Sequence, residues 1–287
     1  MTARKVWIPR SVLLLVAASL LTACGGVRFF YDRLDMLLPW YLGGYVELEP
    51  SQRSDLERRV DALLAWHRRT EVSRYAGFFR QLQAAAERPV EAGQFEAWRR
   101  ETEALWRDLA LKAVPEAAAL LASLSNAQVE ALIGGLRADQ AELAEEIAGR
   151  SPAERLERRR KSLEKQFKRW LGRLEAGQLA MIDEAARQLA TDSEGWLSSR
   201  SAWTDAFEKA LADRRDPEAF PARLRTLLVN GESTWPVAYR QSFEADRGRV
   251  IRLMADIDRS LTPRQRAHLR ERLGRWAADL EAIAADR

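Results

Sequence analysis

The sequence is poor in the side chains that build metal sites and nucleophilic sites. Its 287 residues include one cysteine, Cys24, and two histidines, His67 and His268. A single cysteine excludes an intramolecular disulfide, and no cysteine and histidine residues have the spacing of a zinc site. The sequence also lacks a glycine-rich phosphate loop and a serine-nucleophile motif. We therefore expect no cofactor and no metal, and we expect that the protein is not an enzyme.

Alternating apolar and polar residues, the pattern of a strand, are almost missing and appear only weakly at Gly44–Leu48. Apolar residues recur instead at helical spacing, and breakers such as Asn230-Gly231 and Trp235-Pro236 separate the helical stretches. This pattern predicts an all-α protein, built as an elongated multi-helix array or bundle. Pro115 is expected to open a separate short helix that ends near Ser123. The later helices are predicted at 126–148, 152–174, 177–190, 194–213, 217–228, 236–259 and 263–285.

The only long uncharged apolar run lies at the N-terminus. Arg4, Lys5 and Arg10 precede an apolar stretch over residues 11–21, which is the layout of a signal peptide and is short for a membrane span. Leu21-Thr22-Ala23-Cys24 resembles the lipobox of bacterial lipoproteins. The resemblance implies that residues 1–23 are a lipoprotein signal peptide and that Cys24 carries diacylglyceryl and further acyl chains such as palmitate.

Lipidation would attach an all-helical periplasmic domain, residues 24–287, to a membrane, with candidate points of subdivision near residues 150 and 190. Gly25 follows the cysteine, and the Asp that retains such lipoproteins in the inner membrane is missing. We therefore expect the periplasmic face of the outer membrane rather than the inner membrane. Removal of three leader cations lowers the formal net charge from +4 to +1, so the charge gives no sign of a nucleic-acid partner.

The mature chain resembles a family of uncharacterised bacterial lipoproteins. The residues that carry the resemblance are Tyr31-Asp32-Arg33-Leu34-Asp35, Trp40-Tyr41-Leu42, Leu63-Leu64-Ala65-Trp66-His67-Arg68-Arg69 and Leu261-Thr262-Pro263-Arg264-Gln265-Arg266. The resemblance implies a class of protein and no catalytic residues. The last stretch also resembles the Leu-Thr-x-x-Gln motif of small periplasmic proteins with chaperone activity, which are helical cradles.

A Leu-x-x-x-Gln pattern recurs before predicted helices. It appears at Leu48/Gln52, Leu124/Gln128, Leu174/Gln178 and Leu261/Gln265, and again at Leu136/Gln140 within a helical stretch. Ser125 and Thr262 precede two of these glutamines by three residues, which is the spacing of a capping box. Helix capping therefore explains the Leu-Thr-x-x-Gln stretch without kinship to the chaperones.

Residues 27–42 are apolar on nearly every side of a helix and must be covered by protein or by lipid. Two arrangements are open: packing into a groove between later helices, or lying in the membrane interface. We favour packing against the body, because Asp32 and Asp35 suit arginines of the body better than an anionic lipid surface.

The residues with the best claim to an interaction are Trp40, Tyr41, His67, Arg158, Arg159 and Arg160. An unperturbed histidine changes charge near neutral pH, which makes His67 a candidate, but a half-buried histidine bonded to a carbonyl or carboxylate is the simpler interpretation. The three arginines belong to a basic stretch that would suit anionic lipid or cell-wall acid, or form the solvated face of an amphipathic helix. Trp98, Trp106 and Trp170 are expected in the core.

Three functions remain open at this point. The favoured one is a membrane-anchored envelope lipoprotein that acts as a non-enzymatic binding or scaffolding module for envelope proteins, cell wall or anionic lipid. The second is a chaperone-like helical cradle, which would require an open concave apolar surface. The third is a cell-wall hydrolase or lyase, which would require a cleft with two acids roughly 5 to 10 Å apart.

Overall fold

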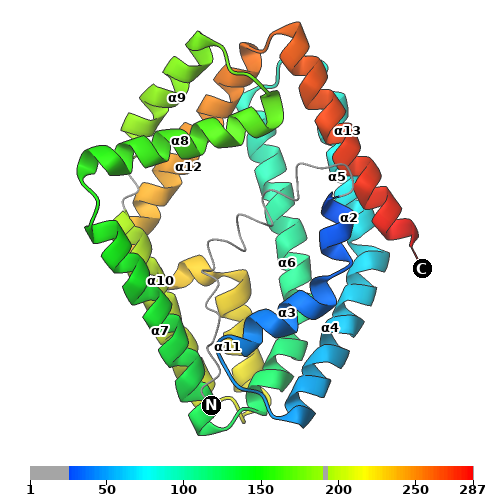
Figure 1. Cartoon of the computed structure of the whole chain (residues 1–287), viewed down its shortest axis with the longest axis vertical. Coiled ribbons are helices and arrows are strands. Elements are labelled where there is room, and N and C mark those ends of the chain that lie inside the picture. The colour runs from blue at the N-terminus through cyan, green and yellow to red at the C-terminus, as the bar shows by residue number, and fades with distance from the viewer. Residues whose placement is uncertain (1–25, 190–192, 287) are drawn as a thin grey trace, which may run out of the picture.

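The computed structural model of the chain describes residues 26–189 and 193–286, and these residues confirm the all-α fold (Figure 1). The leader and Cys24 lie outside the described residues. The described part contains no strand and consists of α2 (Gly26–Tyr31), α3 (Leu34–Gly43), α4 (Pro50–Thr70), α5 (Val72–Ala85), α6 (Ala92–Ala122), α7 (Asn126–Ala148), α8 (Pro152–Leu171), α9 (Ala176–Gln188), α10 (Ser193–Ala212), α11 (Ala219–Val229), the short 3-10 helix η1 (Gly231–Thr234), α12 (Val237–Arg259) and α13 (Pro263–Ala285).

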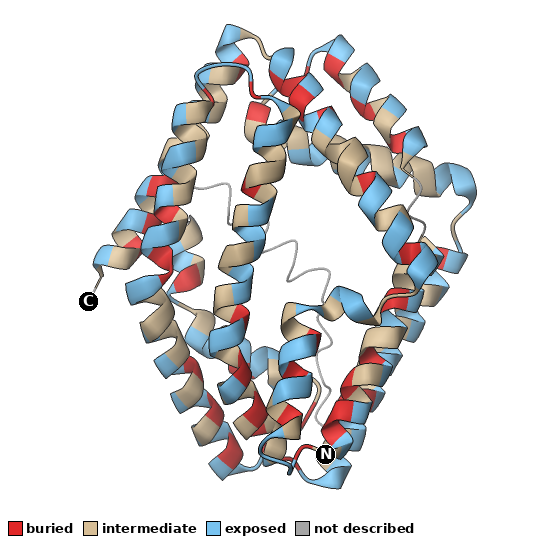
Figure 2. Cartoon of the chain, turned by 180° about the vertical axis from the view of Figure 1, so that it is seen from behind, coloured by how far each residue is buried: buried red, intermediate tan, exposed pale blue. Residues whose placement is uncertain are grey.

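The helices follow the edges of a diamond-shaped outline, which is visible from both sides in Figures 1 and 2. Helices α4, α5 and α13 form one side, α7 and α10 form the opposite lower side, and α6 runs along the long axis. Packing joins segments that are distant in sequence, with α13 on α5, α10 on α7 and α11 on α6. The long-range pairs place the C-terminal helices against the N-terminal half of the chain.

The main core lies in the lower half of this outline, where α4, α6, α7, α10 and α11 meet. Phe220, Leu211 and Leu224 are fully buried there. Such a side chain stabilises the fold by roughly 1.5–3 kcal/mol relative to an exposed one. Smaller cores join α2 to α5 and α13, and α8 to α9 and α12. Core residues are therefore spread along the frame rather than gathered at one centre (Figure 2).

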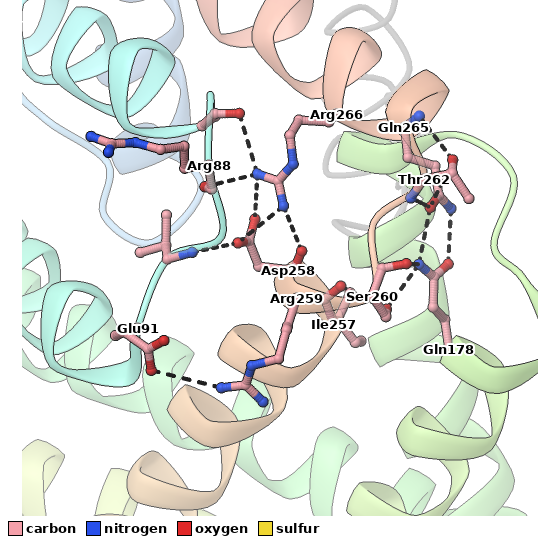
Figure 3. Close-up of polar contacts among 12 residues, drawn as sticks. Arg88, Glu91, Gln178, Ile257, Asp258, Arg259, Ser260, Thr262, Gln265 and Arg266 are labelled. Atoms are coloured by element: carbon pink, nitrogen blue, oxygen red, sulfur yellow. Dashed lines mark hydrogen bonds and ion pairs between the residues drawn. The ribbon is translucent and has the colours of Figure 1, made fainter.

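The recurrent glutamines begin helices and pair across the fold. Gln52 and Gln128 bond to each other where α4 and α7 start, with Nε2 to Oε1 distances of 3.1 and 2.7 Å. Gln178 and Gln265 do the same at the starts of α9 and α13 (Figure 3). The predicted capping boxes at Ser125 and Thr262 are present, so each of these glutamines serves its own helix as well as its partner. Leu136/Gln140, in contrast, lies inside α7.

The prediction of a separate helix opening at Pro115 was wrong. Helix α6 is continuous from Ala92 to Ala122 and contains Pro115. Proline costs a helix one hydrogen bond, about 3 kcal/mol in an exposed interior, and packing must offset that cost. The flanking Val114 and Ala118 are buried, and this burial holds the helix together through the proline.

Two glycines are required by close packing or backbone geometry. A Cβ at Gly135 in α7 would lie 3.1 Å from Cδ1 of Tyr45, so the glycine allows the chain before α4 to approach α7. Gly172 ends α8 with a φ of 74°, a conformation that other residues adopt at a cost.

The expectation that residues 27–42 pack into the body holds for one side of this segment only. Tyr31 and Pro39 are buried, and Asp32 pairs with Arg68 of α4 at 3.3 Å, as expected for an acid facing the body. Phe29, Met36, Leu38, Trp40 and Tyr41 remain exposed. Figure 1 shows α3 crossing the lower part of the outline. Among the described residues, no helix combines the length and the apolarity needed to cross a bilayer.

Candidate functional site

A large apolar cavity lies in the upper half of the molecule, between α5, α6, α8, α12 and α13. Its volume is about 1000 Å³. Nine aromatic side chains contribute to its wall, namely Phe78, Phe79, Phe95, Trp98, Trp106, Phe167, Trp170, Tyr239 and Phe243. Aliphatic residues fill the spaces between them, among them Leu82, Val250 and Ile251. The wall is therefore predominantly apolar.

Some of the aromatic rings at the cavity pack against neighbouring rings. On α6, Phe95 and Trp98 meet edge to face with ring centroids 5.3 Å apart. Beside α12, the ring centroids of Trp235 and Phe243 are 5.0 Å apart, and Phe243 is half-buried. Stiff rings that pack against each other cannot collapse into the space between the helices.

The cavity reaches solvent at Trp106. This side chain is 55% exposed, although it lies in the wall and donates its indole N–H to the Leu228 carbonyl at 3.3 Å. The expectation that Trp106 belongs to the core was therefore wrong. Trp98, which precedes Trp106 by about two helical turns, is buried as expected, but it too contributes to the wall. Its Nε1 is buried and lacks a hydrogen-bond partner among the described residues.

The charged residues of the wall already have partners. Arg99 binds Glu96 at 2.6 Å and also pairs with Glu103, and the bond to Glu96 raises the pKa of Arg99 above its usual range. Asp246 pairs with Arg249 at 2.7 Å. These pairs leave the apolar surface as the part of the site that lacks a partner.

A polar cluster that includes the wall residue Asp258 joins two turns beside the cavity (Figure 3). Asp258 accepts the Val90 amide at 2.7 Å and pairs with Arg266 at 3.4 Å. Arg266 also donates to the carbonyls of Ala86 and Arg88, at 3.2 and 3.0 Å. The cluster joins the α5–α6 loop to the α12–α13 turn and fixes the separation of the helices that form the wall.

His67 lies outside this cavity, at the junction of α2, α4 and α5. Its Nδ1 is 3.0 Å from the Tyr31 hydroxyl and its Nε2 is 3.2 Å from the Tyr75 hydroxyl. Burial lowers the pKa of His67, with Glu71 opposing the shift, and burial raises the pKa of Tyr75 to about 12. This geometry is closest to the simpler interpretation of His67 as a half-buried, hydrogen-bonded histidine. Its partners are tyrosine hydroxyls rather than a carbonyl or carboxylate.

The structure gives each of the three candidate arginines, Arg158, Arg159 and Arg160, a different set of partners. Arg160 bonds Glu157 at 2.8 Å and Glu164 at 3.0 Å, and Arg158 lies 3.7 Å from Glu146. The bond from Arg160 lowers the pKa of Glu157 to about 2. Arg159 reaches the cavity wall and donates to the Ala186 and Leu189 carbonyls at the end of α9, each at 3.0 Å. Of the three arginines, Arg160 is therefore paired within its own helix, whereas Arg158 lies beside an acid of α7 and Arg159 bonds to the backbone of α9.

Trp40 and Tyr41 of α3 are exposed and do not contribute to the cavity wall. The Tyr41 hydroxyl is 3.2 Å from that of Tyr45, which donates to Asp139 of α7 at 2.7 Å.

The cavity was not predicted from the sequence. The available signal was the spacing of Phe95, Trp98, Thr102 and Trp106, which places large rings on one face of α6.

The comparisons with known proteins place the chain in a family. The model of a family of unknown function, DUF6279, matches residues 44–240, which is more than half of the chain, and the chain belongs to this family. The matched region includes α6, α8 and the start of α12, which contribute much of the cavity wall. No curated protein matches the chain, and no solved structure matches it.

Proposed function

We propose that this member of the DUF6279 family is a lipid-anchored protein of the bacterial cell envelope that binds an apolar ligand in its aromatic cavity, without catalysing a reaction. The observation that carries the proposal is the cavity itself. Its volume of about 1000 Å³ is at the upper end of the range of ligand sites, roughly 300–1000 Å³. An apolar wall of this size in contact with water is costly unless a ligand covers it.

The arrangement of charges supports binding rather than chemistry. Acid–base catalysis needs a carboxyl group or base that is free to exchange a proton with the substrate. In the cavity wall, Glu103 pairs with Arg99, Asp246 with Arg249 and Asp258 with Arg266. Each carboxylate is held by a cation, whereas the rings around it are left for a ligand to contact.

The envelope address rests on the N-terminal sequence. The leader ends in Leu21-Thr22-Ala23-Cys24, and two or more acyl chains on Cys24 would anchor the protein stably. Gly25 favours the outer membrane over the inner membrane. Replacement Cys24→Ser tests this part of the proposal, because the serine hydroxyl cannot accept the diacylglyceryl group. We expect loss of processing and loss of acyl label, and a variant that still fractionates with membranes at the mature mass would contradict the anchor.

Ligand binding is tested with the chain from Gly25 onward, which contains every helix that the structure describes. The uncharged probe N-phenyl-1-naphthylamine should become fluorescent in the cavity, and long-chain fatty acids should displace it. Val250 lies in the wall, so Val250→Trp should fill part of the space and weaken probe binding about tenfold or more.

A matched control lies on the same helix. Val237 of α12 is 65% exposed and takes no part in the cavity wall, so Val237→Trp adds the same ring outside the site. Equal loss of binding in both variants would show that the added tryptophan acts elsewhere. Absence of probe binding to the parent chain would contradict the proposal.

The second candidate is a chaperone-like cradle for envelope proteins. Two observations favour it: the cavity opens to solvent at the exposed Trp106, and its aromatic wall would suit apolar segments of an unfolded chain. A cradle should suppress aggregation of a reduced, unfolded client at equimolar ratio, and Val250→Trp should reduce that effect. Suppression without displacement by fatty acids would favour the cradle over a binding site for small apolar ligands.

A further inference from the structure

The exposed apolar side chains of the described residues gather at one end of the sequence. Half of the large hydrophobic residues with high exposure lie within residues 29–41, namely Phe29, Met36, Leu38, Trp40 and Tyr41. Met36 is 62% exposed and Trp40 is 55% exposed, as much as side chains at polar surface positions. We call these five residues the α2–α3 face. None of them contributes to the cavity wall.

Helix α3 does not have the polar outer side of an ordinary surface helix. Its ten residues carry one charge, Asp35, and the side directed toward the body is marked by the buried Pro39. At about 100° per residue, Met36, Trp40 and Tyr41 lie roughly 60°, 100° and 160° around the helix axis from Pro39. All three are exposed, at positions where a helix in water normally carries charged residues. The helix is therefore apolar toward the protein and apolar toward its surroundings.

The α2–α3 face is held firmly on the body. The buried Tyr31 bonds to His67 of α4, and Asp32 pairs with Arg68. At the other end, the hydroxyls of Tyr41 and Tyr45 are 3.2 Å apart, and Tyr45 donates to Asp139 of α7. These contacts fix both ends of the segment, so its exposed rings form a preorganised surface.

We infer that the α2–α3 face lies in the headgroup region of the bilayer to which Cys24 is attached, an inference that rests on the proposed lipid anchor. Helix α2 begins at Gly26, two residues after Cys24, so acyl chains on that cysteine would place this face at the membrane. Tryptophan and tyrosine prefer the interface between lipid and water. The guanidinium of Arg33, stacked 3.4 Å from the centre of the Phe29 ring, supplies a cation beside these rings for lipid phosphate.

The experiment uses the chain from Gly25 onward, which lacks Cys24, so that binding depends on the face rather than on acyl chains. Co-sedimentation is measured with vesicles of phosphatidylethanolamine and phosphatidylglycerol. We expect the parent chain to bind, and we expect Met36→Gln combined with Trp40→Gln to weaken binding by about tenfold or more. Val237→Gln is the matched control, because Val237 is 65% exposed but lies on α12.

Three outcomes would overturn the inference. In the first, the parent chain does not bind the vesicles. In the second, the double variant binds them as tightly as the parent does. In the third, Val237→Gln weakens vesicle binding equally. A chain that ignores vesicles but dimerises through Met36 and Trp40 would assign the face to a second copy instead. Circular dichroism melts identify any variant that has unfolded, and the single variant Trp40→Gln then replaces the double variant. Failure of the lipid anchor is measured separately by Cys24→Ser, and failure of the cavity by the probe.

Discussion

Gln178 and Gln265 each donate a side-chain N–H to the other's carbonyl oxygen, at 3.0 and 2.8 Å (Figure 3). They are 87 residues apart in sequence and both are buried. Each amide also bonds to the backbone of the opposite turn, Gln178 to Ser260 and Gln265 to Arg173. One pair of side chains thus starts two helices and joins the two turns that precede them. Gln52 and Gln128 repeat the arrangement at the starts of α4 and α7.

We predict that these glutamine pairs contribute to stability as units. Gln265→Ala leaves a buried amide and a buried carbonyl without partners and should lower the free energy of unfolding by about 1–3 kcal/mol. Gln178→Ala should cost about the same, and the double variant should cost less than the sum of the two. Urea titrations of the four proteins measure the coupling. Gln188→Ala is the control, since this residue is exposed and bonds Glu184 within its own helix. Additive effects would contradict a coupled pair.

Neighbouring glycines of α7 provide a second prediction. A Cβ at Gly134 would meet nothing within 4 Å, so Gly134→Ala should raise the free energy of unfolding by about 0.5–1 kcal/mol through better helix propensity. Gly135→Ala should fail to give this gain, because its Cβ would lie 3.1 Å from the Tyr45 ring. Thermal melts of the two variants compare the same substitution at adjacent positions. Equal stabilisation would mean that Tyr45 moves aside freely.

Pro115 should be replaceable with a gain in stability. It is exposed within the continuous helix α6 and removes one backbone hydrogen bond there. Pro115→Ala restores that bond, and we expect the free energy of unfolding to rise by about 1–3 kcal/mol. A lower melting temperature for the variant would indicate that the bend at Pro115 is needed to fit α6 between its neighbours.

His67 should make stability depend on pH. Its pKa in the folded protein lies below the ordinary histidine value of 6.5, mainly because burial disfavours the charged ring. The unfolded chain therefore binds a proton more readily than the folded chain does. The stability from the neutral ring is complete above about pH 6.5 and is lost as the pH falls from there through the lowered pKa. His67→Gln removes the titrating group, so the difference between the two proteins should shrink toward acidic pH. A constant difference from pH 5 to 8 would contradict this assignment.

The sequence by itself determined the helical class and most helix starts. Apolar spacing gave the helices, and Ser125 and Thr262 marked N-termini because capping involves residues three positions apart. The lipobox is likewise read from residues that are adjacent in sequence. The apolar character of residues 29–41 was also evident from the sequence, but which of their side chains pack against the body was not.

Only the tertiary structure decided how these helices meet. The pairing of Gln178 with Gln265, the stacking of α13 on α5 and the Asp258–Arg266 cluster all join residues or elements brought together by the packing of the helix frame. The cavity depends on these contacts, since Phe95, Phe167 and Phe243 come from three helices and line one space only when the frame sets their separation. A single sequence shows that such rings are apolar. Whether they fill a core or leave a cavity is decided by the distance at which their helices are held.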